Sequence, residues 1–173
     1  MVNRILIVGA NPSLRSTTSK AFDQSTKSGT LLRDWIGPAW DSTFCEFALT
    51  NVYGQPTPDN RPPNKAEIEE GKEALKEFIQ YFNPHRIVSI GKVPAKVLTQ
   101  MGLEFYEMPH PSGLNRKLND KEWAEEKIKG LRHYISIPLL NDQDLEHQAS
   151  ILERSQDCVD LSAVSVNVSS DSR

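Results

Sequence analysis

A histidine between two prolines and two asparagines far from it in the sequence are the side chains best suited to chemistry in this 173-residue chain. His110 lies in EMPHPSGLNRKLND, where Pro109 and Pro111 restrict the backbone on both sides. Asn11 lies in GANPS and Asn51 in TNV. A carboxamide at the floor of a pocket can read a donor and an acceptor on the edge of a planar base. The rigid flanks favour a functional role for the histidine.

The loop that continues from His110 combines hydroxyl, backbone N–H and cationic groups, a mixture suited to phosphate contacts. Gly113 lets the backbone approach a ligand closely, and an exposed Leu114 can act as a wedge in a DNA stack. Plainer interpretations stay open, because an asparagine can simply close a turn, a loop histidine can be solvated, and single exposed leucines are common. The candidate DNA-contacting residues of this loop are Ser112, Gly113, Leu114, Asn115, Arg116 and Lys117.

Short apolar runs and helical periodicities alternate along the chain. The runs predict buried strands at 4–9, 43–52, 86–91 and 103–108. Helices are expected at 30–37, 65–82, 92–102 and 143–154, and a further one follows Asn119. Asn64 is expected to cap the helix at 65–82, with Glu67 in the capping-box position. Asn119 is expected to cap the helix that follows it, with Glu122 in the corresponding position. The alternation predicts an α/β fold with three layers, α/β/α, around a central, mostly parallel four-stranded sheet.

The polar segments of the sequence follow the ends of the predicted strands. In a parallel sheet, ligands bind beyond the carboxyl ends of the strands. The segments 10–13, Asn51 with its proline-rich continuation, 91–94 and 109–116 should therefore converge on one edge. This convergence predicts a single site.

Composition and charge narrow the possible classes. The chain is 38% hydrophobic and 25% charged, as in globular proteins, and its net charge is −3. Residues 141–173 carry seven acidic against two basic side chains, and 1–140 carry sixteen against eighteen. We therefore expect a weakly basic α/β domain at 1–140, followed at 141–173 by a helix and an acidic tail that is flexible from about residue 155.

The cysteine count and the apolar runs set further expectations. Cys45 and Cys158 share no metal-ligand spacing, so two free thiols and no metal are expected. The sequence contains no run of about 18 apolar residues, so no membrane span is expected. The apolar run at the N-terminus is too short for a signal peptide, so we expect a cytoplasmic protein.

Together, the motifs GANPS, TNV and HPSGLNR, in this order, resemble those of the uracil-DNA glycosylase superfamily. The likeness runs from about residue 5 to 135 and includes the stretch from NRPPN to AKVL. The motifs are most similar to the mismatch-specific and single-strand-selective branches. The proline-rich stretch is more similar to the iron–sulfur branch, whose cysteines this chain lacks.

The resemblance implies a base-flipping DNA glycosylase without a metal or organic cofactor. Asn11 would position the attacking water, and Asn51 would read the base edge. The backbone at Ala10 and the His110 side chain would hold a base carbonyl oxygen. Phe22 is the candidate stacking aromatic, Ser112, Arg116 and Lys117 would grip phosphates, and Leu114 would fill the vacated stack.

Two departures from the family pattern affect the expected reaction. Asn11 stands where the fastest members carry a carboxylate, and an amide cannot accept the proton of water, so modest turnover is expected. Ser13 stands where strict uracil enzymes carry a bulky aromatic, which leaves room for a 5-substituent. The implied substrate is DNA, single- or double-stranded, with uracil or a related or modified pyrimidine.

The resemblance implies a monofunctional N-glycosylase, which we expect to be a monomer, cytoplasmic, and associated with the nucleoid when it acts on DNA. Two other functions remain open. One is a non-catalytic reader of modified or damaged bases, including a partner regulated by DNA mimics, and the other is a hydrolase of free modified nucleotides. An unrelated function on the same fold is a further alternative.

Overall fold

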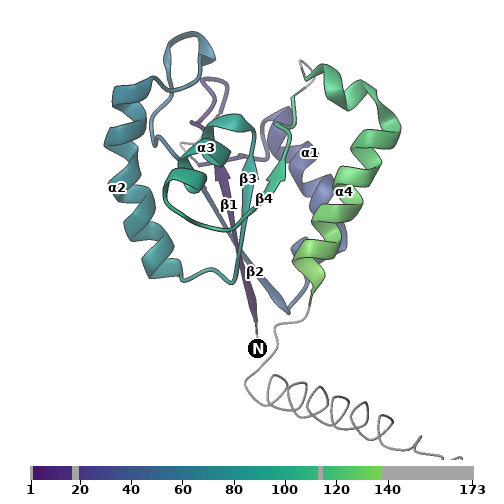
Figure 1. Cartoon of the computed structure of the whole chain (residues 1–173). Helices are drawn as coiled ribbons and strands as arrows, with labels where there is room; N and C mark the ends of the chain where they lie inside the picture. The colour runs from purple at the N-terminus through teal and green to yellow at the C-terminus, as the bar shows by residue number, and fades with distance from the viewer. Residues whose placement is uncertain (1, 17–19, 113–114, 138–173) are drawn as a thin grey trace, which may run out of the picture. The chain divides into compact units, whose positions relative to one another are not determined.

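The computed structural model describes residues 2–16, 20–112 and 115–137 (Figure 1). The predicted helix at 143–154, the acidic tail, Gly113 and Leu114 lie outside these residues. None of the described helices is both long and apolar enough to cross a membrane.

Four parallel strands form the central sheet: β1 (Asn3–Gly9), β2 (Cys45–Asn51), β3 (Arg86–Ile90) and β4 (Tyr106–Met108). Their order is β2-β1-β3-β4, so the chain crosses from one side of β1 to the other between β2 and β3. The register pairs Gly9 with Asn51 and Ile90 with Met108. The carboxyl ends of the strands therefore meet at one edge of the sheet. The strand order reverses between β1 and β3, and α/β folds bind ligands at such a point.

Helices cover both faces of the sheet (Figure 1). Leu6 and Val8 of β1 pack with residues of α2 (Lys65–Phe82) and α3 (Lys92–Gln100). Ile5 and Ile7 face the other way and pack with α1 (Lys27–Ile36) and α4 (Lys121–Ser136). Because successive side chains of a strand point to opposite faces, a continuous apolar run is buried on both sides. The predicted three-layer α/β/α fold is confirmed, with a sheet that is wholly parallel.

The structure confirms one of the two predicted helix caps and corrects the other. Asn64 and Glu67 form the predicted capping box of α2, with each side chain bonded to the backbone of the other residue. The prediction that Asn119 caps α4 is wrong, because Asn119 ends a 3-10 helix (Arg116–Asn119) and Asp120 is the extended residue whose side chain accepts from the Trp123 N–H. Two further 3-10 helices occupy Gly37–Asp41 and Pro58–Asn60.

Two other boundaries differ from the expectation by three residues. Helix α1 begins three residues earlier than expected, at Lys27, because the Thr26 side chain accepts from the Gly29 N–H and caps the first turn. Strand β4 is limited to Tyr106–Met108, the residues that pair with β3.

Candidate active site at the carboxyl ends of the strands

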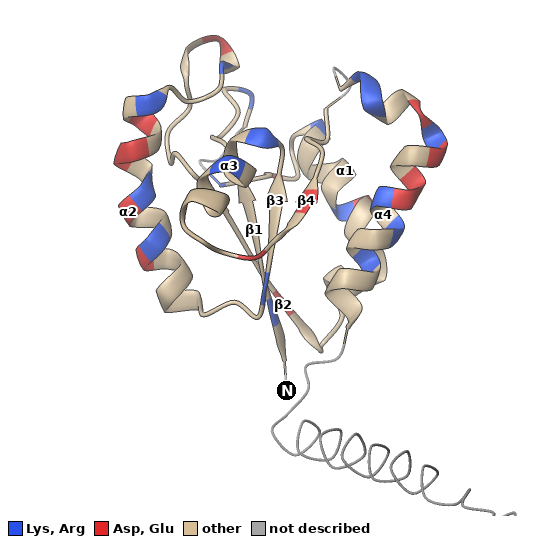
Figure 2. Cartoon of the chain, in the orientation of Figure 1, with Lys and Arg blue, Asp and Glu red and all other residues tan. Residues whose placement is uncertain are grey.

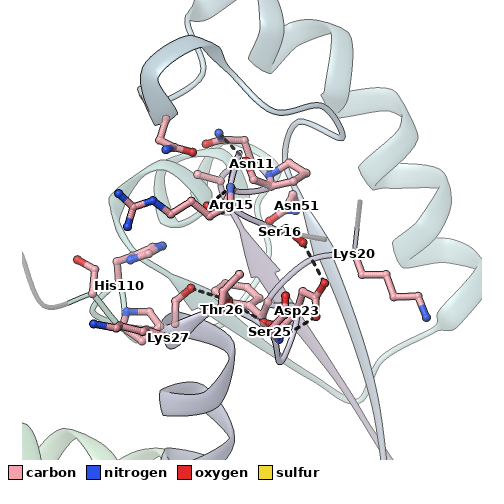
Figure 3. Close-up of a pocket in the computed structure, with 18 of the residues that line it drawn as sticks. Asn11, Arg15, Ser16, Lys20, Asp23, Ser25, Thr26, Lys27, Asn51 and His110 are labelled. Atoms are coloured by element: carbon pink, nitrogen blue, oxygen red, sulfur yellow. Dashed lines mark hydrogen bonds between the residues drawn. The ribbon is translucent and has the colours of Figure 1, made fainter. Parts of the chain in front are cut away.

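A pocket of about 700 Å³ lies at the carboxyl edge of the sheet (Figure 3). It is built from the loops that follow β1, β2 and β4 and from the first turn of α1, as expected for a site at the strand ends. Seven of the residues predicted for the site line it: Ala10, Asn11, Ser13, Phe22, Asn51, His110 and Ser112. The structure thus brings together residues that lie up to a hundred positions apart in the sequence.

Asn11 is partly buried in the pocket wall, and its carboxamide is held from behind. Its Nδ2 atom donates to Thr57 Oγ1 at 2.9 Å and to the Pro12 carbonyl at 3.3 Å. Thr57, at 1% exposure, belongs to the proline-rich loop after β2. Since both bonds use the nitrogen, the amide oxygen is the atom left for a ligand.

Asn51 and Phe22 meet above Gly9 at the end of β1. Asn51 is the last residue of β2 and pairs with Gly9, so the strand register alone places it there. A Cβ on Gly9 would overlap the Asn51 Oδ1 atom and would lie 2.8 Å from the Phe22 ring. The absence of a side chain at this one position lets an amide and an aromatic ring share the floor of the pocket.

The backbone of Phe22 is in the left-handed region, with φ of 50°, which is rare for a bulky residue. A tight turn fixes it there. The Thr26 hydroxyl donates to the Asp23 carbonyl at 2.6 Å, and the Ser25 N–H donates to the Asp23 carboxylate at 3.0 Å. Gly29 packs so closely on this turn that its Cβ would overlap the Phe22 and Asp23 carbonyl groups. Backbone strain of this kind persists only where the surroundings enforce it, often at functional sites.

His110 faces the pocket from the loop after β4. Its ring centroid lies 6.5 Å from that of Phe22, with 40° between the planes. The imidazole keeps solvent exposure, yet the surrounding protein desolvates it enough to lower the pKa of His110 below its usual 6.5. The neutral form of the ring is therefore favoured, and in it one nitrogen can donate and the other can accept.

The remainder of the His110 loop is held by its own hydrogen bonds. Asn115 Nδ2 donates to the His110 carbonyl at 3.3 Å, and Asn115 Oδ1 accepts from the Lys117 N–H. Arg116 and Lys117 are exposed, and Lys117 Nζ lies 5.6 Å from the centre of the Trp123 ring. Asn115, Arg116 and Lys117 do not line the pocket itself, but they lie three to five positions after Ser112, which does.

Three cations of the pocket wall were not predicted from the sequence. Arg15, Lys20 and Lys27 all line the pocket, and Figure 3 shows Arg15 and Lys27 extending on the His110 side of the view. No helix or strand was predicted between residues 10 and 29, so these side chains had no assigned direction. Thr26 was the available signal, because threonine is a favoured helix N-cap and places Lys27 in the first turn of α1.

Residues 2–130 match the family model described as the Uracil DNA glycosylase superfamily. A relative named DNA polymerase, from Bacillus phage SP01, is 27% identical over 148 residues. The similarity covers 78% of this chain, but the chain spans only 16% of the length of the phage protein.

Proposed function

This chain belongs to the uracil DNA glycosylase superfamily, and from this premise we propose that it hydrolyses the N-glycosidic bond of uracil, or of a related or modified pyrimidine, in DNA. The proposal rests on four groups that line the same pocket. An acceptor amide (Asn11), a base-reading amide (Asn51), an aromatic ring (Phe22) and a neutral imidazole (His110) all line it. Each of these four groups suits a different part of a flipped nucleotide.

In the proposed reaction the flipped base lies over Phe22, and the Asn51 amide pairs with its polar edge. The bond between the base nitrogen and the anomeric carbon breaks, and its electron pair stays on the base. The neutral His110 N–H and the backbone at Ala10 stabilise the charge that develops on a base carbonyl oxygen. Water, oriented by Asn11, adds to the anomeric carbon and loses a proton, which neutralises the departed base anion directly or through solvent. The enzyme is monofunctional on this reading, since water is the nucleophile.

The identity of residue 11 affects the rate. An amide oxygen orients water by accepting a hydrogen bond, but it does not take up the proton, and it carries less charge than a carboxylate to stabilise an oxocarbenium ion. We therefore expect modest turnover.

Ser13 affects the choice of base. Ser13 is small, lines the pocket, and its Oγ accepts from the Arg15 N–H at 3.1 Å. A small side chain leaves space beside the base, so 5-substituted uracils should be accepted. Strict preference for unsubstituted uracil would contradict this part of the proposal.

A DNA partner is supported by the charges around the pocket. Arg15, Lys20 and Lys27 line it, and Arg116 and Lys117 follow Ser112 at its edge. Figure 2 shows basic segments above the carboxyl ends of the strands, whereas α2 and α4 carry both signs of charge. Binding through such cations should weaken steeply with salt if several phosphates of a strand are contacted. A weak salt dependence would favour a free nucleotide as substrate.

The test is a panel of oligonucleotides that carry uracil, 5-hydroxymethyluracil, hypoxanthine, xanthine or a thymine mismatch, each single- and double-stranded. Abasic sites are detected by alkaline strand scission. Wild-type protein should cleave the pyrimidine substrates, and Asn11→Ala should abolish cleavage. Gln100→Ala is the matched control, because it removes an exposed carboxamide at the end of α3. Binding without cleavage by the wild type would instead indicate a reader of altered bases.

A further inference from the structure

A buried threonine that was not among the predicted site residues lies directly behind Asn11. Thr57 follows β2 in the proline-rich loop, 46 residues from Asn11 in the chain. Its Oγ1 atom is 2.9 Å from Asn11 Nδ2, and it is 1% exposed. Thr57 does not line the pocket, so it has no direct contact to offer a base.

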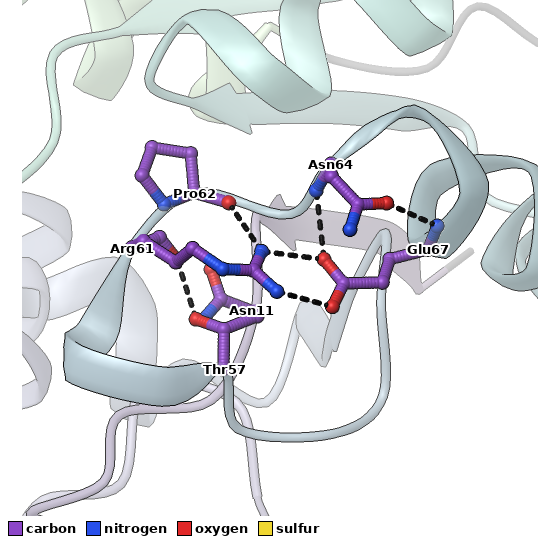
Figure 4. A network of polar contacts seen from close by, with 6 residues as sticks. All are labelled: Asn11, Thr57, Arg61, Pro62, Asn64 and Glu67. Atoms are coloured by element: carbon purple, nitrogen blue, oxygen red, sulfur yellow. Dashed lines mark hydrogen bonds and ion pairs between the residues drawn. The ribbon is translucent and has the colours of Figure 1, made fainter.

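The hydrogens available at Thr57 determine which way the Asn11 amide points. A hydroxyl has one hydrogen, and Thr57 donates it to the Arg61 carbonyl (Figure 4). Toward Asn11 the Thr57 oxygen can then only accept. The second neighbour of the amide, the Pro12 carbonyl, is also only an acceptor. The group that faces both must be the NH₂ of Asn11.

This arrangement leaves the Asn11 oxygen as the pocket-facing atom. A water molecule that donates one hydrogen to this oxygen has its lone pairs turned away from it, available to attack. If the amide were rotated by 180°, the NH₂ group would face the pocket and donate to the water, which would engage one of its two lone pairs and withdraw electron density from the oxygen. The orientation of the amide therefore affects how nucleophilic the bound water is.

The loop that carries Thr57 is fixed to helix α2. The Arg61 guanidinium forms two bonds to the Glu67 carboxylate, at 2.7 and 2.6 Å, and a third to the Pro62 carbonyl at 3.1 Å. Glu67 in turn accepts from the Asn64 N–H at 2.7 Å and so belongs to the capping box of α2 (Figure 4). A bidentate arginine–carboxylate pair is directional. The chain of contacts holds the Arg61 carbonyl where the Thr57 hydroxyl needs it.

We propose that Thr57 is a positioning residue that locks the Asn11 carboxamide with its oxygen toward the pocket, and thereby orients the attacking water. The role in catalysis rests on the proposed glycosylase function. The orientation itself rests only on the hydrogen bonds among Asn11, Pro12, Thr57 and Arg61.

Three variants separate this role from a merely structural one. Thr57→Val keeps the shape and removes the hydroxyl, whereas Thr57→Ser keeps the hydroxyl. Thr99→Val is the matched control, because Thr99 also donates its hydroxyl to a backbone carbonyl, that of Ala95, but on α3 and outside the pocket lining. Single-turnover base release should fall about tenfold in Thr57→Val, as expected from the loss of one orienting hydrogen bond. KM should stay within about twofold, because Thr57 does not touch the base.

The expected pattern is therefore a lower single-turnover rate in Thr57→Val, rescue in Thr57→Ser, and no change in Thr99→Val. Equal rates in Thr57→Val and Thr99→Val would overturn the proposal. So would a Thr57→Ser protein as slow as Thr57→Val, since shape and not the hydroxyl would then matter. Thermal unfolding of all three proteins identifies any variant whose loss is due to misfolding, in which case the serine variant and the amide measurement below decide.

A second readout does not depend on activity. In protein labelled with ¹⁵N at asparagine, the side-chain NH₂ resonances of Asn11 are assigned by their loss in Asn11→Ala. Their hydrogens should exchange slowly in the wild type and in Thr57→Ser, and faster in Thr57→Val. Unchanged exchange in Thr57→Val would overturn the orientation. If wild-type protein released no base at all, the proposed function would fail, and the exchange data would still test the contact between Thr57 and Asn11.

Discussion

Asn11 and His110 face the same pocket but are held in different ways. Asn11 is fixed by directional hydrogen bonds that continue through Thr57 and Arg61 to helix α2. His110 is fixed by prolines on both sides and by packing, with its Cβ 3.6 Å from the position that a Cβ on Gly91 would occupy. Among the residues that the structure describes, the His110 imidazole has no hydrogen-bond partner of its own.

The difference suits the two proposed tasks. A group that orients water must present one atom, and hydrogen bonds behind it decide which atom that is. A group that stabilises a developing oxyanion needs its N–H available until the ligand arrives, so a partner within the protein would compete. Conformational restriction without a hydrogen bond gives His110 a narrow range of positions and leaves the N–H for the base.

The largest loss of activity is expected when His110 is replaced. His110→Ala removes one oxyanion donor and should lower single-turnover base release by about 10²–10³. His133→Ala, an exposed histidine near the end of α4, is the control and should have no effect. Affinity for an oligonucleotide with a non-hydrolysable analogue should change far less than the rate, since the proposed bond strengthens only as charge develops. An equal loss of affinity would mean that His110 binds the ground state, and the proposed division of tasks would be wrong.

A smaller effect is expected at Gly9, which lies beneath the floor shared by Asn51 and Phe22. In Gly9→Ala the new methyl group overlaps the Asn51 oxygen and the Phe22 ring. Overpacking of this kind costs about 1–3 kcal/mol of unfolding free energy. Displacement of the two side chains should also raise KM for base release, while Asn11, in the wall of the pocket, keeps its bond to Thr57. The measurements are urea unfolding and KM.

Gly54→Ala is the matched control for this variant, because a Cβ at Gly54 meets nothing within 4 Å. A Gly9→Ala protein with the stability and KM of the control would show that the floor of the pocket is more compliant than its packing indicates.

The sequence predicted the frame of this site well, and the reason is physical. Unbroken apolar runs fixed the buried strands, and parallel strands necessarily align their carboxyl ends, so Asn11, Asn51 and His110 had to converge. Local hydrogen bonding fixed the capping box at Asn64. Phe22 was assigned to the pocket only through the family resemblance, because its left-handed backbone depends on the turn at Asp23 and on Gly29, which no local pattern reveals.

The contacts that orient side chains could not be predicted in the same way. Thr57 looked like one more polar residue in a proline-rich loop, because its contact with Asn11 is defined only after that loop folds back against the segment that follows β1. The cap of α4 was misassigned by one residue, since a 3-10 helix precedes it and nothing in the composition distinguishes Asn119 from Asp120. Topology follows from patterns of burial, whereas the orientation of an amide follows from individual hydrogen bonds.

The smallest effect is expected at Glu67, the last residue in the series of contacts that starts at Asn11. The pH dependence of stability distinguishes the contribution of Glu67 from that of His110. Bonds from Arg61 and then from the Asn64 N–H lower the pKa of Glu67 from 4.5 to about 2. Because the folded protein holds this carboxylate charged while the unfolded chain protonates near pH 4.5, the stabilisation is complete above pH 4.5 and is lost as pH falls toward 2. The His110 contribution also declines on acidification, but it begins to do so near pH 6.5, where the unfolded histidine protonates before the folded one.

Glu67→Gln should therefore be less stable than the wild type by a constant amount above pH 4.5, and the two unfolding curves should converge as pH approaches 2. Glu70→Gln, on an exposed position of the same helix, is the control. If the difference in stability between the two proteins already disappeared near pH 6.5, its pH dependence would come from His110 and not from Glu67. If base release at pH 7 also falls slightly in Glu67→Gln, with KM unchanged, the tie from α2 through Arg61 and Thr57 reaches Asn11. Unchanged release would show that Thr57 holds the amide without help from the helix.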